Sequence, residues 1–509
     1  MNWGATKQSL TGLTLGALAF GLVMLGTRPP GPGLYGDSAG YMGAAESLVQ
    51  HGTLRVPFAP YTSADSTSPL AQWPPGFPVA IAAPMMLGAN AVTGARLVVA
   101  ASAAVTVFLT VVLVGTTFAF AWGLVAALVL ALTASVVAVH LDALSEPPFI
   151  TAVVATLFLM ANRPDRPLQY GLTGAVALML RYVGLGVVAA CGVWAAMQPA
   201  PSLGVRLRRG IVAVLPGVIA YIAWAAVVSA HGGTVRRLHL DHYPLQTLRQ
   251  FLGATLSWLG PDPVGVTVGA ARFARAAMKV VLVVGVACVI AREWQQSRIV
   301  RAGVLLGVAC AGLLLVAQLL QGNVELSDRM LSPVHAVLDI AIVAALAAWW
   351  PWSRRHAIAL AGLGVWAIVS VRAVGTLVYV ARTEGFYHAK LEVVRSGLWT
   401  WVRDSAQANS AGAQGNTAAL YSNDVADVYF ATHRPSRAMP WIVDPDTARA
   451  LATALARQPS LVIWASGYTE SVIFPELRPI AATPERLEAL LRLKRRAVFP
   501  EGIVWEYVR

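Results

Sequence analysis

Charged residues are scarce in this chain of 509 residues. Only 12% of the positions are Asp, Glu, Lys or Arg, whereas a soluble globular protein has about 25%. Hydrophobic residues make up 57% of the sequence. Because so few charges cannot cover the surface of a water-soluble protein of this length, the composition excludes that class. It indicates a chain that crosses a membrane several times.

Cysteine is also scarce. The chain has three, Cys191, Cys288 and Cys310, and each lies inside an apolar run without the spacing of metal ligands. We expect all three to be small packing residues. The segment after residue 383 contains no cysteine, so no disulfide supports it.

A motif for nucleic-acid binding is missing as well. The formal net charge is +13, but no basic run is interleaved with aromatic residues. Most arginines fall in short loops between apolar runs, as expected from the positive-inside rule and from contact with anionic lipids. We therefore expect membrane lipids as partners and no nucleic acid.

Long apolar runs are abundant. A helix needs about 20 apolar residues to cross a membrane, and the runs predict about 11 transmembrane helices. The short pair around Arg181 fits either one broken helix or two half-spans, with Arg181 in the membrane region. The expected spans lie near 9–27, 94–118, 121–139, 148–161, 170–181, 184–198, 211–230, 265–290, 302–320, 331–350 and 357–381.

Loop charges orient these spans. The first run is not followed by a small-x-small cleavage site, so we expect a retained helix with a cytoplasmic N-terminus. The positive-inside rule then places the long loops 28–93 and 231–264 outside. Residues 77–87 are apolar but short and bounded by proline. Counting them as a crossing would move the arginine loops outside, so we expect an interfacial helix there.

The composition becomes mixed near residue 383. We expect a transmembrane module over 1–383 and an extracytoplasmic α/β domain over 384–509. Alternation of strand and helix patterns predicts the α/β class. The expected strands lie at 418–422, 461–465 and 502–508, and the expected helices at 447–457 and 484–496.

Two acidic stretches fall on the outer side. Asp37 follows the first span, and Glu146 begins a later one. Inverting glycosyl transfer from a lipid phosphate needs one carboxylate to take the proton of the acceptor, and Asp37 is our candidate base. Its alternative role is a helix N-cap. Glu146 is a candidate for binding a sugar hydroxyl, and alternatively a first-turn acid that the helix dipole stabilises.

Further polar residues lie near these two acids. We expect His140, Asp142, Tyr41 and Trp73 to contact substrate, although His140 also reads as an interfacial histidine and Trp73 as a residue that shapes its loop. The acids and His140 are compatible with a divalent cation. Since no ligand spacing requires one, we predict no metal and no other cofactor.

Two arginines are candidates for binding a phosphate, because a guanidinium presents a fork of donors to phosphate oxygens. Arg329 lies at the outer end of a span, and Arg181 between the two short spans. Alternatively, Arg329 is an interfacial anchor that pairs with Glu325 or Asp328, and Arg181 pairs with an acid of a neighbouring helix.

Several short segments resemble a known family. They are 37–41 (DSAGY), 73–78 (WPPGFP), 94–97 (GARL), 144–147 (LSEP), 174–184 (GAVALMLRYVG), 328–333 (DRMLSP), 421–424 (YSND), 429–430 (YF) and 434–435 (RP). In this order they resemble the GT-C glycosyltransferases, especially the bacterial branch related to protein O-mannosyltransferases and aminoarabinose transferases. The chain departs from the usual motifs at three positions. It has Ser38 where the protein mannosyltransferases have Glu, Glu146 where many relatives have Asp, and Met330 where Tyr is usual. The first departure weakens the case for a protein acceptor.

The resemblance implies an enzyme of the bacterial inner membrane. The donor is then a polyprenyl-phosphate sugar, bound near Arg329 or Arg181 with its lipid chain between helices. The acceptor is an extracytoplasmic glycan, lipid or protein, and Asp37 deprotonates it. The alternatives are a multi-pass transporter or lipid flippase, and a non-catalytic scaffold. A transporter is less favoured because we find no internal repeat and most polar residues fall in outside loops.

Overall fold

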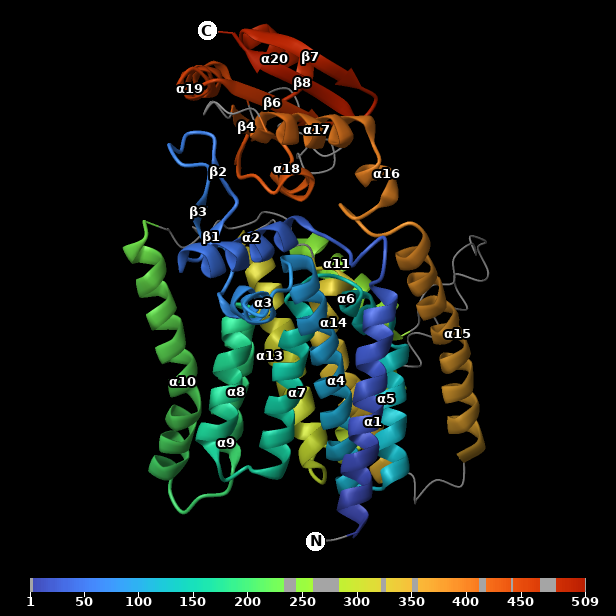
Figure 1. Ribbon diagram of the computed structural model, residues 1–509. Helices are drawn as coiled ribbons and strands as arrows, with labels where there is room; N and C mark the ends of the chain where they lie inside the picture. Colours follow the sequence, from blue (N-terminus) through green and yellow to red (C-terminus); the bar gives the residue numbers. More distant parts are fainter. Residues whose placement is uncertain are drawn as a thin grey trace.

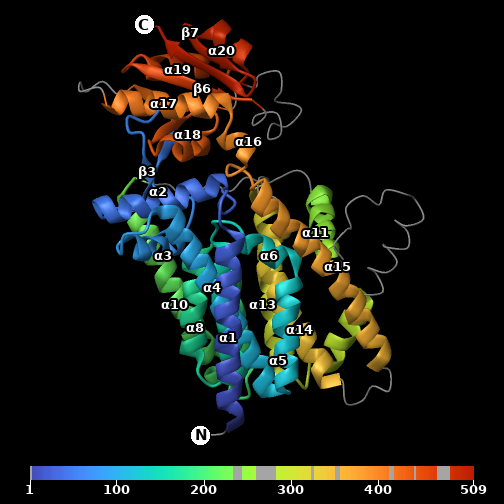
Figure 2. The ribbon, with the colours of Figure 1, turned by 45° about the vertical axis from the view of Figure 1, so that its right-hand side comes forward.

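The computed structural model divides into a bundle of helices and an α/β layer above it, with the N-terminus at the far end of the bundle and the C-terminus in the α/β layer (Figures 1 and 2). Two short helices, α2 (Gly36–His51) and α3 (Gly76–Met85), lie between them. The structure describes residues 3–232, 244–259, 283–321, 326–349, 356–411, 418–440, 443–466 and 482–508.

The bundle agrees with the predicted spans. Within the described residues, five helices are long and apolar enough to cross a membrane, namely α1, α4, α10, α13 and α14. The number is six if α5 and α6, which are bent by 69° to each other, cross as one span. The chain is therefore a multi-pass α-helical membrane protein. The predicted span 265–290 lies largely outside the described residues. The bundle helices are α1 (Trp3–Gly26), α4 (Ala91–Thr117), α5 (Phe120–Leu132), α6 (Ala134–His140), α7 (Glu146–Asn162), α8 (Pro167–Leu180), α9 (Gly184–Met197), α10 (Leu203–Ala230), α11 (Pro244–Leu259), α13 (Arg298–Gln321), α14 (Asp328–Trp349) and α15 (His356–Thr383).

The two short segments around Arg181 form two separate helices rather than one broken helix. Helices α8 and α9 pack against each other as a hairpin, and Arg181 lies at its turn with an extended backbone. The turn depends on Gly184, because a Cβ there would collide with the backbone of Leu178. Glycine thus allows the close return that places Arg181 at the end of the hairpin nearer the α/β layer, and we call the bundle ends on that side the outer ends (Figure 1).

The segment predicted as an interfacial helix forms α3. This helix has ten residues and packs against α2, α4 and the outer end of α8. Its length of about 15 Å at 1.5 Å per residue is too short for a crossing. Together, α2 and α3 form a shelf at the outer ends of the bundle (Figure 1).

A mixed sheet of six strands forms the α/β layer, in the order β2-β5-β4-β6-β8-β7. The first four are parallel, and β8 and β7 are antiparallel. The edge strand β2 comes from the first long loop and pairs with β5, which the sequence did not predict. The strands are β2 (Phe58–Pro60), β4 (Ala419–Ser422), β5 (Ser436–Ala438), β6 (Ser460–Ala465), β7 (Leu493–Phe499) and β8 (Gly502–Tyr507), and a separate pair joins β1 (Arg55–Val56) to β3 (Ser68–Pro69).

Helices cover both faces of the sheet, which confirms the predicted α/β class. On one face, α17 (Gly397–Ala411) and α18 (Val425–Thr432) pack over Leu420, Ile463 and Val504. On the other, α19 (Pro445–Leu455) and α20 (Pro484–Leu490) cover a core that contains Tyr421, Val462 and Trp505. The alternation along each strand sends neighbouring residues to opposite faces.

The predicted helix over 484–496 is wrong in its second half. Helix α20 ends at Leu490, and β7 begins at Leu493. The basic residues that suggested a helix C-terminus lie instead on an edge strand, where charge discourages further pairing. Arg495 donates to both carboxylate oxygens of Glu488, at 2.6 and 2.7 Å, and this ion pair joins the strand to the helix before it.

Candidate active site at the outer ends of the helices

Four charged side chains meet at the outer ends of α2, α7, α8 and α14, and we call them the charged centre: Asp37, Glu146, Arg181 and Arg329. Arg329 bridges the two acids, because its Nη2 donates to Asp37 Oδ2 at 2.7 Å and its Nε to Glu146 Oε1 at 2.6 Å. Arg181 Nη1 lies 2.8 Å from Glu146 Oε2. The structure thus brings together the predicted base, the second-loop acid and both phosphate candidates.

The start of α2 places Asp37. The N-cap is Tyr35, whose backbone N–H donates to Ser38 Oγ at 3.0 Å. Asp37 is therefore in the first turn, and its alternative role as the cap is wrong. The Ser38 hydroxyl donates to the carbonyl oxygen of Ala143 at 2.9 Å. This bond ties α2 to the loop before Glu146, and the first turn of α2 brings the Asp37 carboxylate to Arg329. The Asp37 carboxylate also lies near the positive end of the helix dipole.

The members of the charged centre differ in exposure. The Glu146 side chain is fully enclosed, whereas 32% of the Asp37 side chain is exposed. Arg181 and Arg329 lie between, at 12% and 21%. Glu146 is thus placed to hold the two guanidinium groups, while Asp37 is open to a molecule that arrives from outside. Glu146 and Asp37 both hold Arg329 in position, and Glu325, one of the two acids expected as its alternative partners, lies outside the described residues.

Three residues of the site were missed by the sequence reasoning. Ser145 Oγ accepts from Arg181 Nη1 at 2.9 Å and lies 3.0 Å from the hydroxyl oxygen of Tyr41. Met330 Sδ accepts from Arg181 Nη2 at 3.1 Å. The guanidinium carbon of Arg329 stands 4.4 Å from the centre of the Tyr35 ring, a cation–π distance. The only signal for them is adjacency, since each lies within two residues of a predicted site residue.

Tyr41 and Trp73 belong to an aromatic wall beside the charged centre. The Tyr41 ring packs 5.4 Å from Trp73 and 5.2 Å from Phe77, centre to centre. Gly40 makes room for the indole, because a Cβ there would collide with it. The Tyr41 hydroxyl reaches the charged centre through Ser145, and burial and the Asp37 carboxylate raise the pKa of Tyr41. Tyr41 is thus a neutral hydroxyl at neutral pH.

Asp142 lies next to the charged centre in the loop between α6 and α7. Its loop is joined to residue 33 through two backbone bonds, Gly33 N–H to Leu141 O and Ala143 N–H to Gly33 O, both 2.9 Å. The residue is 5% exposed. Burial raises the pKa of Asp142 to about 8, against the opposing charge of Arg329. Asp142 is therefore largely protonated at neutral pH, and it can donate a hydrogen bond.

His140 points elsewhere. Its Nδ1–H donates to the carbonyl oxygen of Val136 at 2.7 Å, and the ring lines a cavity of about 510 Å³ between α1, α4, α6 and α15. His140, Asp142 and Glu146 do not form a metal-ligand group in the described part of the chain. The group with that spacing is His388, Asp424 and Asp427, of which only Asp424 lies in a segment that carried the resemblance.

An apolar groove approaches the charged centre from the other side. It has a volume of about 730 Å³ and runs between α3, α8 and α10. Its lining includes Ala80, Val176, Pro216 and, at the outer end, Leu180. Leu180 directly precedes Arg181, so this end of the groove lies one residue along the chain from the charged centre.

No family model and no curated protein matches the chain. Solved structures do. ArnT from Cupriavidus metallidurans in the apo state is 13% identical with a TM-score of 0.60, and the match covers 99% of this chain and 98% of that one. ArnT from the same organism bound to undecaprenyl phosphate is 14% identical, with a TM-score of 0.56 and 98% coverage of both chains. The apo oligosaccharyltransferase of Archaeoglobus fulgidus is 11% identical with a TM-score of 0.52, covering 91% of this chain and 70% of that one. This likeness is one of fold, and the chain has the GT-C fold that its short motifs predicted.

Proposed function

We propose that the chain is an integral membrane glycosyltransferase that moves a sugar from a polyprenyl-phosphate donor to an extracytoplasmic acceptor, with inversion. The observation that carries the proposal is the bridge that Arg329 makes between Asp37 and Glu146 at 2.7 and 2.6 Å. A guanidinium group, which is well suited to bind phosphate, here contacts a partly exposed carboxylate. The likeness in fold to an ArnT structure with undecaprenyl phosphate supports this donor class.

The donor phosphate binds to Arg181 and Arg329 in this proposal. Both guanidinium groups are held on Glu146, which is fully enclosed, so they are preorganised for an anion. The groove between α3, α8 and α10 ends beside Arg181. An isoprenoid chain in this groove would bury its apolar surface while its phosphate stays at the charged centre.

The chemistry needs one base. Asp37 takes the proton of the acceptor hydroxyl while the acceptor oxygen attacks the anomeric carbon from the face opposite the phosphate. The bond from the anomeric carbon to the phosphate oxygen breaks, and its electron pair leaves with the polyprenyl phosphate. Arg181 and Arg329 stabilise that developing charge. Because a phosphate leaves as an anion, no second carboxyl group has to protonate it.

Other predicted site residues have supporting roles in the proposal. Asp142 and Tyr41 are neutral donors beside the charged centre and bind sugar hydroxyls, with Trp73 supporting Tyr41. His140 faces the cavity near α1, so it contacts substrate only if a ligand extends there. We further propose that the N-terminus is cytoplasmic and that residues 384–509 lie outside the inner membrane of a bacterium, over a transmembrane module of residues 1–383.

The transporter alternative finds less support. A transporter should place polar residues on broken helices near the middle of the membrane. The charged centre lies instead at the first turns of α2, α7 and α14. This is where a reaction at the membrane surface would take place.

A transfer assay with Asp37→Asn tests the proposal. Purified protein in nanodiscs receives radiolabelled polyprenyl-phosphate sugars and native membrane extract as acceptor source. The substitution keeps the shape and removes the base, so we expect turnover to fall by about 10²–10⁴-fold with donor binding retained. The matched control is Asp65→Asn in the same loop, whose carboxylate is 76% exposed and lies 3.4 Å from Arg55.

Full activity of Asp37→Asn would remove this residue from the chemistry. If the wild-type protein transfers no sugar from any donor but moves labelled lipid across the bilayer, the flippase alternative would replace the proposal.

A further inference from the structure

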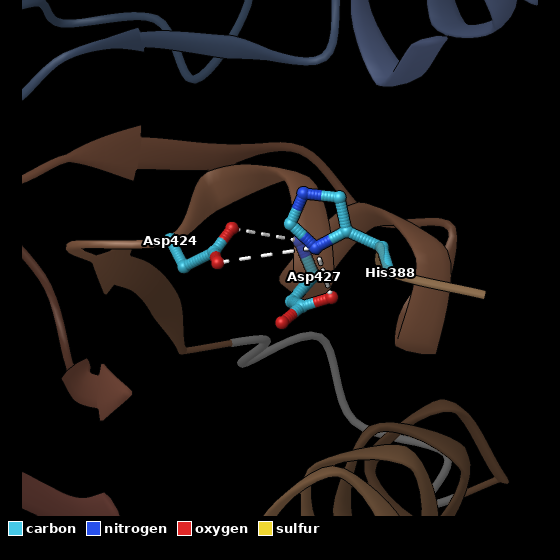
Figure 3. A group of neighbouring side chains, drawn as sticks. All are labelled: His388, Asp424 and Asp427. Carbon is cyan, nitrogen blue, oxygen red and sulfur yellow. Dashed lines mark hydrogen bonds and ion pairs between the residues drawn. The ribbon is translucent and has the colours of Figure 1, made fainter. Parts of the chain in front are cut away.

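A second cluster of ionisable side chains lies where the chain passes from the bundle to the α/β layer, and we call it the junction cluster: His388, Asp424 and Asp427. His388 lies between α15 and α16 (Leu391–Val394), Asp424 is the N-cap of α18, and Asp427 is in its first turn. Figure 3 shows both carboxylates turned toward the imidazole. His388 Nδ1 lies 2.7 Å from Asp427 Oδ1 and 4.0 Å from Asp424 Oδ2.

The junction cluster has an excess of negative charge. Both aspartates are buried, with 5% and 7% of each residue exposed. Two carboxylates face one imidazole, so one negative charge stays uncompensated within the cluster even when the ring is protonated. Burying an ionised carboxylate without a balancing positive charge is unfavourable, and a divalent cation would balance the two carboxylates.

We propose that His388, Asp424 and Asp427 bind one divalent transition-metal cation, with Zn²⁺ as the best fit. One imidazole nitrogen and two carboxylate oxygens form a donor set that zinc accepts, whereas Mg²⁺ and Ca²⁺ prefer oxygen alone. The three ligand atoms lie within 4.8 Å of one another.

Small movements would complete the coordination. Zinc ligands at about 2.0–2.2 Å from the metal in tetrahedral geometry are separated by about 3.3–3.6 Å. His388 Nδ1 would release its proton to solvent when it binds the metal, so the pair at 2.7 Å would widen, and the pair at 4.0 Å would close. Asp424 can do this without losing the cap, because the N–H of Asp427 donates to its Oδ1 at 3.1 Å while Oδ2 faces the imidazole.

The position of the cluster suggests what the cation does. The backbone N–H of His388 donates to the carbonyl oxygen of Leu34 at 3.0 Å, and the Tyr387 ring packs 3.6 Å from that of Tyr35. Leu34 and Tyr35 directly precede the helix that carries Asp37. A cation bound to His388, Asp424 and Asp427 would thus join α18 to residues 387–388, which contact Leu34 and Tyr35. It would hold the α/β layer over the charged centre. Cation binding can be measured without any transfer reaction, so this inference does not depend on the proposed function.

The test uses the full chain in nanodiscs, stripped of metal with EDTA and with any polyhistidine tag removed. Zinc stoichiometry is measured by elemental analysis after equilibration with buffered free Zn²⁺, affinity by competition with a chromophoric chelator, and Tm with and without Zn²⁺. The variants are Asp424→Asn, which keeps an N-cap, Asp427→Asn, which keeps an acceptor for the imidazole, and the double variant. The control is His433→Asn at the C-terminal end of α18, an exposed histidine 3.9 Å from Glu46, since asparagine tolerates its left-handed backbone.

We expect one Zn²⁺ per wild-type chain and a Tm that rises on adding Zn²⁺. Each single variant should lose at least about 100-fold in affinity, because even second-layer partners of a metal contribute 10–100-fold. The double variant should lose both the zinc and the Tm shift, while His433→Asn keeps both. Wild-type protein without zinc at micromolar free Zn²⁺ would overturn the proposal. So would a double variant that retains zinc, or equal stabilisation by Ca²⁺ or Mg²⁺.

Discussion

The charged centre and the junction cluster are built from the same kinds of groups but with different charge balance. The charged centre pairs two guanidinium groups with two carboxylates, and each acid has a partner at 2.8 Å or less. The junction cluster sets one imidazole against two carboxylates. A balanced cluster can take an anion only by exchange, so a phosphate must compete with Asp37 for Arg329. A cluster with excess negative charge can accept a cation, which would replace the proton that His388 Nδ1 shares with Asp427.

One loop connects the two clusters. Gly33 shares backbone hydrogen bonds with the loop of Asp142, and Leu34 shares one with His388. Asp37 follows three residues later in the chain. A change at the junction cluster can therefore reach the charged centre through this short segment, which makes the comparison between the clusters testable by substitution.

The largest expected effect comes from breaking the balance of the charged centre. Glu146→Gln leaves two guanidinium groups with one carboxylate, and the Glu146 side chain is fully enclosed. Removing one partner of a buried ion pair costs about 3–5 kcal/mol. We expect a large fall in Tm in nanodiscs, followed by tryptophan fluorescence, together with loss of transfer.

The matching change in the junction cluster is Asp427→Asn in metal-free protein. It removes a negative charge from a cluster that has one in excess and keeps an acceptor for the imidazole. We expect the free energy of unfolding to change by about 1 kcal/mol or less. Equal losses in Glu146→Gln and Asp427→Asn would contradict the difference in charge balance.

An effect smaller than that of Glu146→Gln concerns the third acid near the charged centre. The folded-state pKa of Asp142 is raised from 3.8 to about 8 by burial, with Arg329 opposing and Glu146 reinforcing the shift. The folded state therefore binds this proton more tightly than the unfolded state, and stability falls as the pH rises from about 4 to about 8. Asp142→Asn should remove this slope and raise Tm at pH 8 by a few degrees, on the order expected for one or two kcal/mol. Parallel Tm profiles of variant and wild type between pH 5 and pH 9 would argue against a buried neutral carboxyl group.

The smallest expected effect on transfer tests which of the two apolar cavities holds the lipid chain of the proposed donor. Val176→Trp would partly fill the groove between α3, α8 and α10, at a site that is 55% exposed. We expect KM for the donor to rise several-fold, about 1 kcal/mol, with kcat unchanged. Leu22→Trp in the cavity near α1, at a site that is 58% exposed, is the control. A rise in KM for the donor only in Leu22→Trp would move the lipid chain to that cavity.

Apolar runs predicted the bundle well because each span is a local property of the sequence. The predicted segments near 94–118, 211–230 and 331–350 correspond to α4, α10 and α14. The basic end of the predicted helix 484–496 failed, because the pairing of β7 with β8 decides the conformation there. The strand β2 could not be foreseen either, since its partner β5 is almost 400 residues away.

At the site, too, local sequence predicted the residue types but not the contacts between distant segments. Loop position and residue type singled out Asp37 and Glu146 as acids and Arg181 and Arg329 as phosphate ligands, because a carboxylate can take a proton and a guanidinium group binds phosphate oxygens. Neither property indicates which residues touch, and so Ser145, Tyr35 and the junction cluster were missed. His388 and Asp427 are 39 residues apart and meet only when the chain folds back.

By itself, the sequence determined the membrane class, the spans and the types of residue at their outer ends, because these follow from local hydrophobicity and charge. The tertiary structure alone decided that Arg329 bridges Asp37 and Glu146, and that His388 meets two buried aspartates. Both are contacts between segments far apart in the chain. They depend on how helices pack, which no local pattern records.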